Sequence, residues 1–473
     1  MKQPLPLPLL AAALSGVLLA ASFPPHGLWP LAWTALVPLF FAALRSASPG
    51  RAGFLGAVTG AFFYPAALSW MTNIFNPAVS LLFWAIFALW LALHAALLKF
   101  LWDRVGAAGR GRWGELLWTL LAGAAWAGLE YFRSEAWPLA CPWLGLGYSQ
   151  MSAAPVLQTT SVWGVYGLSA FIASVNAAWV LLLQRRYLAP ILAVFLCALV
   201  SAWGRERLAS FDADAGRPVK AALLQDETLD LESLLELSLS PAAAGADLLV
   251  WPEYAFYMKS GEEGKYSALI AERLGPRFPV SLIASGVQDP GEVAAGRGAN
   301  FVLALGPRGE NYGRYDKLHP VPFVDDGLTP NPAPAPLNTP LGGLGVQICY
   351  DLAFEDGPRK VTVGGAEILI SPTKDPMRWG LKQHLQHSDM SAARAVETGL
   401  WILRPATSGI SQIIDPLGEV RAVLPAGERG VLAGSARLRE GGTFYTAYGW
   451  LFGPLSMALT LGLGLWALFP RRR

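Results

Sequence analysis

The chain has 473 residues, of which 53% are hydrophobic and 15% are charged, whereas an ordinary soluble domain is roughly 45–50% apolar and about 25% charged. This excess of apolar residues predicts a membrane protein. The net charge of +2, with no basic run longer than Arg471, Arg472 and Arg473, gives no indication of a nucleic-acid partner. The three cysteines exclude a disulfide framework and lack the paired spacing of a zinc site, so we expect neither a metal nor another cofactor.

Long apolar stretches fill the first 203 residues and return once near the end of the chain. Eight of them have the roughly 17–25 residues that a helix needs to cross a bilayer. Their centres lie near Leu14, Ala35, Ala61, Ala88, Ala124, Ile172, Phe195 and Leu459. The first stretch follows Lys2 and precedes "AAS", as in a cleavable signal peptide, but "PPHG" leads directly into the second stretch. We therefore expect the first helix to be retained.

Clusters of basic residues occupy alternate joints between these stretches. Lys and Arg precede the first stretch and follow the second, fourth, sixth and eighth, whereas the joints "PPHG" and "TNIFNPA" contain none. Because basic joints stay in the cytoplasm, both termini are expected there. Seven crossings then place residues 204–446 on the outer side of the membrane. The predicted domains are a seven-helix transmembrane domain (1–203), a catalytic domain (204–446), and a last helix with a cytoplasmic tail (447–473).

The middle segment alternates short apolar runs with helical patterns. The runs that predict buried strands are "KAALLQ", "DLLVWPE", "VSLIASG", "NFVLALG", "GVQICY", "EILISP", "WILRPA" and "SQIID". Helical spacing is found in "LESLLELSLS", "KYSALIAERLG" and "HSDMSAARAVETG", the last with a predicted cap at Ser388 and an end near Gly399. Alternating strands and helices predict an α/β sheet domain, in which ligands bind at the carboxyl ends of strands.

Three segments of this domain carry reactive side chains. Glu253 ends "LLVWPE", Lys317 lies in "GRYDKLHPVPF", and Cys349 ends "GVQIC". A carboxylate can take the proton of a thiol, and an ammonium group favours the thiolate and can stabilise an oxyanion. Taken singly, each residue is more often a packing, turn or surface residue. The three together predict a nucleophilic site.

In this order and context, the three residues resemble the Glu-Lys-Cys catalytic triad of the nitrilase superfamily over most of residues 219–435. Insertion of this domain between a seventh and an eighth span narrows the resemblance to the apolipoprotein N-acyltransferases. Further similarity lies in "CPWLGLGYSQ", "YDKLHPVPF", "MSAARAVETG" and "RPATSGIS". The fold implied is a polytopic α-helical membrane domain of eight transmembrane helices with an inserted α/β nitrilase-like sandwich.

The resemblance implies a transfer of an acyl chain between two lipids in the bacterial inner membrane. Glu253 would take the proton of Cys349, whose sulfur would form a thioester with an acyl chain from a phospholipid. Lys317 and the backbone N–H of Tyr350 would stabilise the oxyanion. The amine of a diacylglyceryl-modified apolipoprotein would then attack the thioester. The implied partners are the phospholipid donor, the apolipoprotein acceptor and the lipid bilayer, and we expect a monomer.

Several further positions could support this site. Trp143 and Tyr148 could form an interfacial aromatic belt or line the entry of lipids. The proline-rich segment 321–340 could act as a lid. Asp325 and Asp351 stand where relatives often carry Glu, and "SPTKDPMRWG" departs from the Ser-Asn-Asp pattern that usually follows the next strand. These departures leave the triad intact. They bring into question whether substrates are positioned as in the relatives.

Two other functions are compatible with the sequence. A membrane-tethered nitrilase-type amidase or acyltransferase could act on another amide or amine, and a non-catalytic membrane module could keep the fold for binding. The three reactive groups together argue against the non-catalytic module. A transporter is disfavoured because the spans contain few ionisable residues besides His94 and Glu130.

Overall fold

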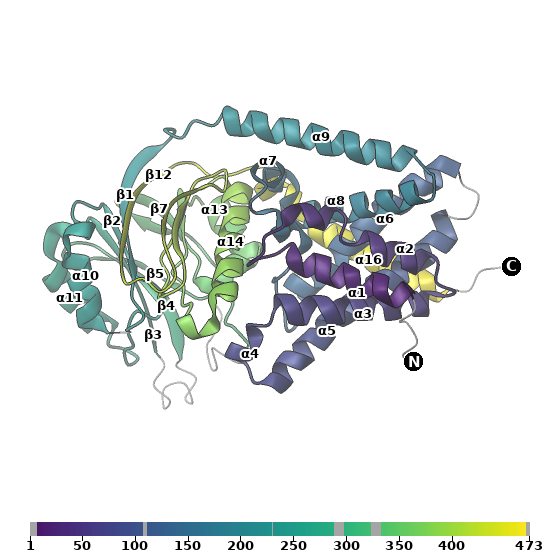
Figure 1. Ribbon diagram of the computed structural model, residues 1–473. Coiled ribbons are helices and arrows are strands. Elements are labelled where there is room, and N and C mark those ends of the chain that lie inside the picture. Colours follow the sequence, from purple (N-terminus) through teal and green to yellow (C-terminus); the bar gives the residue numbers. More distant parts are fainter. Residues whose placement is uncertain (1–6, 107–110, 229, 288–297, 323–332, 470–473) are drawn as a thin grey trace. The chain divides into compact units, whose positions relative to one another are not determined.

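The computed structural model describes residues 7–106, 111–228, 230–287, 298–322 and 333–469 (Figure 1). The chain divides into two compact units, one formed by Met1–Ala209 with Tyr448–Arg473 and the other by Ser210–Ala447. We call them the helical unit and the sheet unit and describe each by itself. Asp325 and half of the proposed lid, residues 323–332, lie outside the described residues.

Apolar helices make up the helical unit. They are α1 (Leu7–Ala21), α2 (Val37–Leu44), α3 (Pro49–Ala67), α4 (Met71–Ile74), α5 (Pro77–Leu101), α6 (Gly111–Tyr131), α7 (Ala154–Leu157), α8 (Thr160–Leu183), α9 (Leu188–Ala209) and α16 (Phe452–Leu468). The second predicted stretch is broken, because a 3₁₀ turn at Trp29–Trp33 precedes α2.

Four helical segments in the described part of the chain are long and apolar enough to cross a membrane. They are Pro77–Val105, Thr160–Leu183, Leu188–Ala209 and Gly449–Leu468. Leu7–Ala21 and Trp29–Leu44 are apolar but shorter. Helices α3 and α6 also coincide with predicted stretches, but they contain several Gly residues or charged residues that reduce their hydropathy.

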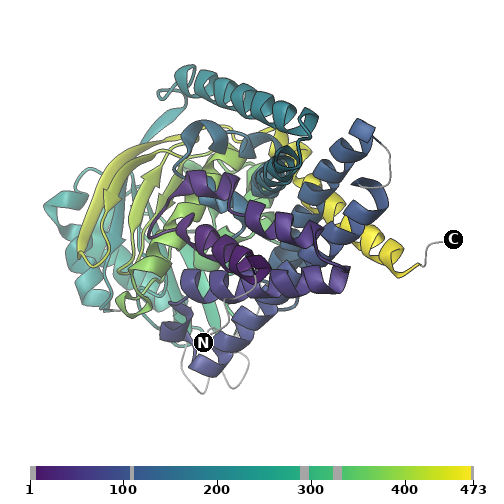
Figure 2. The same cartoon turned by 45° about the vertical axis from the view of Figure 1, so that its right-hand side comes forward.

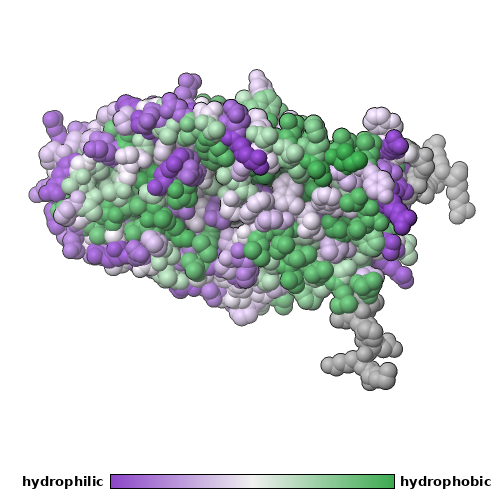
Figure 3. All heavy atoms as spheres, turned by 45° about the horizontal axis from the view of Figure 1, so that its top comes forward, coloured by the Kyte–Doolittle hydropathy of each residue, from purple (hydrophilic) through white to green (hydrophobic). Residues whose placement is uncertain are grey.

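Large hydrophobic side chains are exposed on the outer faces of these helices. Figure 3 shows hydrophobic surface over much of the helical unit and mainly hydrophilic surface over the sheet unit. On α9, for example, Ile191, Phe195 and Leu199 are more than half exposed. A continuous apolar exterior of this kind is expected where a protein faces lipid instead of water.

Close helix packing in this unit depends on small residues. A Cβ atom on Gly56 of α3 would lie 2.4 Å from the carbonyl oxygen of Leu91 in α5. A Cβ atom on Gly128 of α6 would lie 2.3 Å from the carbonyl oxygen of Ser456 in α16. Small residues let membrane helices approach closely, so these two glycines fix the α3–α5 and α6–α16 contacts.

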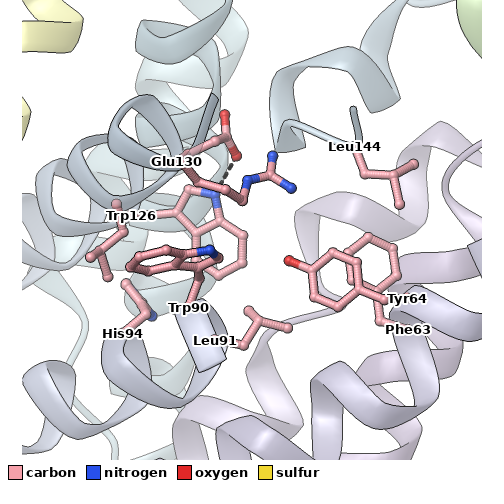
Figure 4. A pocket seen from close by; sticks show the side chains of 10 residues that line it. Phe63, Tyr64, Trp90, Leu91, His94, Trp126, Glu130 and Leu144 are labelled. Carbon is pink, nitrogen blue, oxygen red and sulfur yellow. Dashed lines mark hydrogen bonds between the residues drawn. The ribbon is translucent and has the colours of Figure 1, made fainter. Parts of the chain in front are cut away.

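A buried carboxylate connects α6 with the loop that follows it. Glu130 accepts hydrogen bonds from Trp126 Nε1 at 2.9 Å, from the backbone N–H of Leu146 at 2.8 Å and from Ser169 Oγ at 2.5 Å. Figure 4 shows Glu130 and Trp126 in a small pocket that His94 also lines. The Glu130 carboxylate therefore has a structural role within the helical unit.

The sheet unit contains two six-stranded sheets within its described residues. The strands of the first sheet are β1 (Arg217–Gln225), β2 (Leu248–Val250), β3 (Val280–Val287), β4 (Ala299–Leu305), β5 (Asn311–Asp316) and β12 (Gly430–Leu438). Those of the second are β6 (Leu337–Thr339), β7 (Gly342–Val346), β8 (Ile368–Ile370), β9 (Ile402–Arg404), β10 (Ser411–Ile414) and β11 (Val420–Leu424). The accompanying helices are α10 (Leu231–Leu239), α11 (Glu263–Leu274), α13 (Asp356–Val363), α14 (Leu381–Thr398) and α15 (Phe444–Ala447).

The strand orders are β12-β1-β2-β3-β4-β5 and β11-β10-β9-β8-β7-β6. The central strands β1, β2 and β3 are parallel, as are β7, β8 and β9, and antiparallel strands flank each group. Because parallel strands point the same way, the residues that follow β2 and β7 emerge at the carboxyl ends of their sheets.

The sheet unit has four layers. One buried apolar cluster contains residues from both sheets, a second lies between the first sheet and helices α10 and α11, and a third joins the second sheet with α13 and α14. Figures 1 and 2 show the two helix pairs on the outer faces of the two sheets. The apolar runs of the central strands are thus buried on both faces, as their composition predicts.

All eight predicted strands are present, but the sequence did not reveal β5, β6, β11 and β12. These strands lie at or near sheet edges and are rich in polar residues, Gly or Ala, so they lack a continuous apolar run. Helix α14 ends at Gly399, which has φ +70°, as predicted. The predicted cap at Ser388 is wrong, because the helix begins seven residues earlier at Leu381.

Candidate active site

The three predicted reactive residues follow strands of the two sheets. Glu253 follows β2, Lys317 follows β5, and Cys349 opens a 3₁₀ turn (Cys349–Ala353) after β7. Cys349 has φ +51° and Tyr254, next to Glu253, has φ +49°. Non-glycine residues rarely adopt this left-handed conformation, and such backbone strain is concentrated at functional sites.

Glu253 and Lys317 form a buried ion pair. Lys317 Nζ lies 3.0 Å from Glu253 Oε1, and the two side chains are only 2–3% exposed. Asn300 of β4 donates from Nδ2 to the same carboxylate oxygen at 2.6 Å. The other oxygen, Oε2, accepts the backbone N–H of Lys374 at 2.7 Å. The carboxylate is thus held by three donors in one orientation.

The thiol of Cys349 lies in the same buried environment. Burial and the charge of Glu253 raise the pKa of the Cys349 thiol, whereas the charge of Lys317 and the backbone N–H of Lys374 lower it. The backbone N–H of Cys349 donates to the carbonyl oxygen of Pro372 at 2.9 Å, and the N–H of Lys374, two residues further on, donates to Glu253. The segment from Pro372 to Lys374 therefore contacts both the cysteine turn and the Glu253–Lys317 ion pair. A thiol of raised pKa needs a base beside it before it can react.

Asp351 connects the cysteine turn with the lysine segment. Its fully buried carboxylate accepts hydrogen bonds from Tyr315 Oη at 3.0 Å and from the backbone N–H groups of His319 at 2.6 Å and Leu318 at 3.2 Å. It also accepts the N–H of Ile348 at 3.0 Å. Burial raises the pKa of Asp351, and the charges of His319 and Lys317 lower it.

The other proposed supporting residues lie in different parts of the structure. Tyr350 is buried in the cysteine turn, where its ring packs edge-on against Phe354 with centroids 5.0 Å apart. Trp143 and Tyr148 are buried in the helical unit, and Trp143 packs against Trp70 with ring centroids 5.5 Å apart. The position of Asp325 lies outside the described residues.

A second polar cluster adjoins the cysteine and was missed from the sequence. Polar atoms of Cys349, Asp375 and His387 lie within 4.8 Å of one another. Asp375 comes from the divergent "SPTKDPMRWG" segment, His387 from α14, and Arg404 from β9. The unusual sequence of this segment was a signal that could have pointed to Asp375. Three residues so far apart in the chain share no sequence pattern that would have joined them in one site.

The charges in this cluster are already compensated by protein groups. Arg404 donates to Asp375 Oδ2 at 2.6 Å, and its Nη2 atom lies 3.2 Å from His387 Nδ1. Burial alone would raise the pKa of Asp375, but the charges of His387 and Arg404 hold it well below its usual range. Thiolate, carboxylate and imidazole groups can all bind zinc. Since a guanidinium group supplies the positive charge here, we assign no metal to these residues.

Two family models match the chain. One describes the apolipoprotein N-acyltransferase N-terminal domain and matches residues 15–178. The other describes carbon-nitrogen hydrolases and matches residues 220–442, which include Glu253, Lys317 and Cys349.

Curated relatives match over nearly the whole length. An apolipoprotein N-acyltransferase of Geobacter metallireducens is 32% identical over 94% of this chain and 92% of that protein. One from Gloeobacter violaceus is 30% identical over 96% of this chain and 93% of that protein. Among solved structures, a carbon-nitrogen hydrolase from Helicobacter pylori G27 is 20% identical, with a TM-score of 0.40, over 54% of this chain and 96% of that chain.

Proposed function

Because the chain belongs to the apolipoprotein N-acyltransferase family, we propose that it transfers an acyl chain from a phospholipid to the N-terminal diacylglyceryl-cysteine of apolipoproteins. The observation that carries this proposal is the buried Glu253–Lys317 ion pair, which is joined to Cys349 through the segment Pro372–Lys374, whose backbone bonds to both Glu253 and Cys349. This arrangement supplies a base, a cation and a nucleophile for acyl transfer.

In the first half-reaction, Glu253 takes the proton of the Cys349 thiol as the sulfur attacks the ester carbonyl of a phospholipid. The Lys317 ammonium group and the backbone N–H of Tyr350 stabilise the oxyanion of the tetrahedral intermediate. The carbon–oxygen bond of the ester then breaks. Glu253 returns its proton to the leaving lysophospholipid oxygen, and the acyl chain remains on the sulfur as a thioester.

In the second half-reaction, the α-amine of the acceptor attacks the thioester carbon. A carbon–nitrogen bond forms, the carbon–sulfur bond breaks, and Glu253 transfers a proton from the nitrogen to the departing sulfur. The amide is released and the thiol is restored. The thioester must be protected from water during this cycle, and the burial of Glu253, Lys317 and Cys349 favours such protection.

The remaining predicted residues have supporting roles in this proposal. Asp351 holds the lysine segment against the cysteine turn, and Tyr350 completes the oxyanion site. We propose that Asp325 positions substrate and that Trp143 and Tyr148 shape the part of the helical unit used by lipids. No bound cofactor is needed for either half-reaction.

Four long apolar helices and the family membership indicate a protein of the bacterial inner membrane. We propose eight crossings, with both termini cytoplasmic and residues 204–446 forming a periplasmic catalytic domain between the seventh and eighth. Residues 1–203 and 447–473 then form the membrane part. Extracting a lipid substrate from the bilayer costs about 0.8 kcal/mol per CH₂ group, so a membrane-anchored catalytic domain avoids a large penalty. A monomer contains every group that the proposed reaction needs.

The direct test is acyl transfer by purified Cys349→Ala and Cys349→Ser proteins reconstituted with phospholipid and a diacylglyceryl-cysteine peptide. Both variants are expected to lose N-acylated product to the background level while inserting normally into membranes. Glu253→Gln and Lys317→Ala are expected to lose at least about 100-fold, because the members of a catalytic unit act together.

Retained activity in either cysteine variant would contradict the mechanism. A wild-type protein that hydrolyses small amides but never acylates the peptide would instead support the amidase alternative, which the carbon-nitrogen hydrolase match favours.

A further inference from the structure

The cluster of Asp375, His387 and Arg404 beside Cys349 is not used by the mechanism above. Asp375 and Arg404 are fully buried and His387 is 3% exposed. A buried imidazole and a buried ion pair are costly to desolvate, so their position beside the nucleophile requires a physical explanation.

Hydrogen bonds hold the imidazole in one orientation. His387 Nδ1 lies 2.9 Å and 3.1 Å from the two carboxylate oxygens of Asp375. An ionised carboxylate only accepts hydrogen bonds, so a proton on Nδ1 faces Asp375, and Nε2 is the ring nitrogen that can exchange a proton with a substrate. Arg404 fixes the carboxylate, and its Nη1 atom donates to the carbonyl oxygen of Ile410 at 2.6 Å.

The proton balance of the second half-reaction leaves a role for a group of this kind. An N-terminal α-amine has a pKa of about 7.7–8.0, so at neutral pH most acceptor molecules arrive as ammonium ions. Two protons must then leave the nitrogen before the amide is complete. Glu253 transfers one of them to the sulfur and ends the cycle ionised, as it began. The other proton must pass to a second base or to water.

We propose that His387, oriented by Asp375, accepts the proton that the acceptor ammonium group must lose before it attacks the thioester on Cys349. The inference rests on the proposed function. A polar atom of the His387 ring lies within 4.8 Å of the sulfur, and the thioester carbon is bonded to that sulfur. An attacking amine therefore comes within reach of the ring directly or through one water molecule. The imidazolium formed later releases the proton to solvent.

Charged and titratable groups from several elements lie near His387 or its partner Asp375. They are Asp375 in the divergent segment, Arg404 on β9, Cys349 in the cysteine turn and His384 on the same helix. Because Cys349 also serves the first half-reaction, the histidine must be tested in the second half-reaction alone.

The test uses the full-length protein and separates the two half-reactions. Wild type and His387→Gln are first incubated with one defined phospholipid, and thioester formation is followed by intact mass spectrometry. The loaded enzymes are then mixed with a synthetic diacylglyceryl-cysteine peptide between pH 6 and 9.5. We expect thioester formation to change less than about 3-fold in His387→Gln. Amide formation should fall about 100-fold at pH 6.5, and the deficit should shrink to about 3-fold at pH 9.5, where the amine is already neutral.

Two further variants provide controls. Asp375→Asn keeps the shape of the side chain but weakens the orientation of the ring, so a smaller loss of about 10-fold with the same pH dependence is expected. His384→Gln makes the same change one turn earlier on α14, where the ring lies 3.1 Å from the carbonyl oxygen of Pro376, and should show no loss confined to low pH.

A deficit in His387→Gln that is equal at every pH, or equal in both half-reactions, would overturn the proposal and indicate a structural role. Unchanged amide formation would also overturn it. If wild type forms no thioester, the proposed function itself fails, and this result is distinct from the others.

Discussion

Asp351 illustrates how one buried carboxylate can hold the parts of a site together. It accepts four hydrogen bonds, three from the segment that carries Lys317 and one from the strand end that carries Cys349. The sequence marked this residue only as a departure from a Glu in relatives. Its function as a connection between two strand ends could not be predicted, since the two segments come from different sheets.

Asp351→Asn should destabilise the sheet unit and reduce activity. Asn offers one acceptor oxygen and turns an NH₂ group toward backbone donors, so at least one buried N–H loses its partner. We expect the free energy of unfolding to fall by about 2–4 kcal/mol, measured by denaturation of the purified protein. Tyr315→Phe removes one of the four donors and should cost only about 1 kcal/mol. Equal stabilities of Asp351→Asn and wild type would refute this role.

Glu355 makes stability depend on pH. Burial raises the pKa of this carboxyl group to about 7, against the hydrogen bond from Tyr445 that lowers it. Between the ordinary value of 4.5 and about 7, folding therefore takes up a proton, and stability falls as pH rises through this window. Glu355→Gln should remove up to about 3 kcal/mol of this dependence.

The prediction is checked by melting temperatures of wild type and Glu355→Gln between pH 4.5 and 8. Wild type should lose stability across this range, and the variant should give a flatter profile. Parallel profiles for the two proteins would show that Glu355 does not titrate as described.

The catalytic residues and their neighbours differ in how far the sequence reveals them. Glu253 and Cys349 were predicted as site residues because each follows an apolar run, and Lys317 because of the motif around it. Asn300, Asp375, His387 and Arg404 were not, because their contacts join segments that are distant in the chain. Asn300, for instance, lies 47 positions from the carboxylate that it contacts.

At the scale of helices and strands, prediction succeeded where an element is apolar throughout. The central strands β2 and β8 are buried along their whole length, and β7 is buried from Gly343 onward. The edge strand β5 carries mainly exposed or half-buried residues and gave no such signal. Helix α14 also begins with polar residues that became buried only through tertiary packing, so its start was predicted too late.

Helix packing in the helical unit offers a test at the same scale. Gly56→Ala would place a Cβ atom 2.4 Å from the carbonyl oxygen of Leu91, and either α3 or α5 must move. We expect a loss of about 1–3 kcal/mol, seen as a lower melting temperature of the purified protein. Gly462→Ala in α16 is the matched control, because among the described residues no atom beyond its neighbours and its own helix backbone lies within 4 Å of the added Cβ. It should be neutral or stabilise the helix by up to about 1 kcal/mol.

Because overpacking causes the expected loss of stability, the two variants should differ in melting temperature. Similar melting temperatures for Gly56→Ala and Gly462→Ala would contradict the proposed α3–α5 contact.

At the scale of the whole molecule, the proposed topology is inferred from the basic clusters at alternate joints. Alkaline phosphatase, which folds only outside the cytoplasm, should be active when it is fused after Ala215 and inactive when it is fused after Arg186. A fluorescent protein that folds only in the cytoplasm should give the opposite pattern. An active phosphatase after Arg186 would contradict the seven crossings proposed before the catalytic domain.

The apolar composition and the order of the three reactive residues were enough to predict the class of protein and the sheet domain. The number of crossings depends on helices such as α3 and α6, whose hydropathy is moderate because small and polar residues serve helix packing. Composition therefore identifies a membrane protein, but it does not determine the number of membrane spans.

The central claim is that Cys349 carries the acyl chain between two lipids, and intact mass spectrometry after incubation with one defined phospholipid tests it most directly. We predict a mass gain of one acyl group on Cys349 that hydroxylamine removes, and that disappears when a diacylglyceryl-cysteine peptide is added and becomes N-acylated. The absence of an adduct, an adduct on another residue, or an adduct that the peptide cannot discharge would contradict the account.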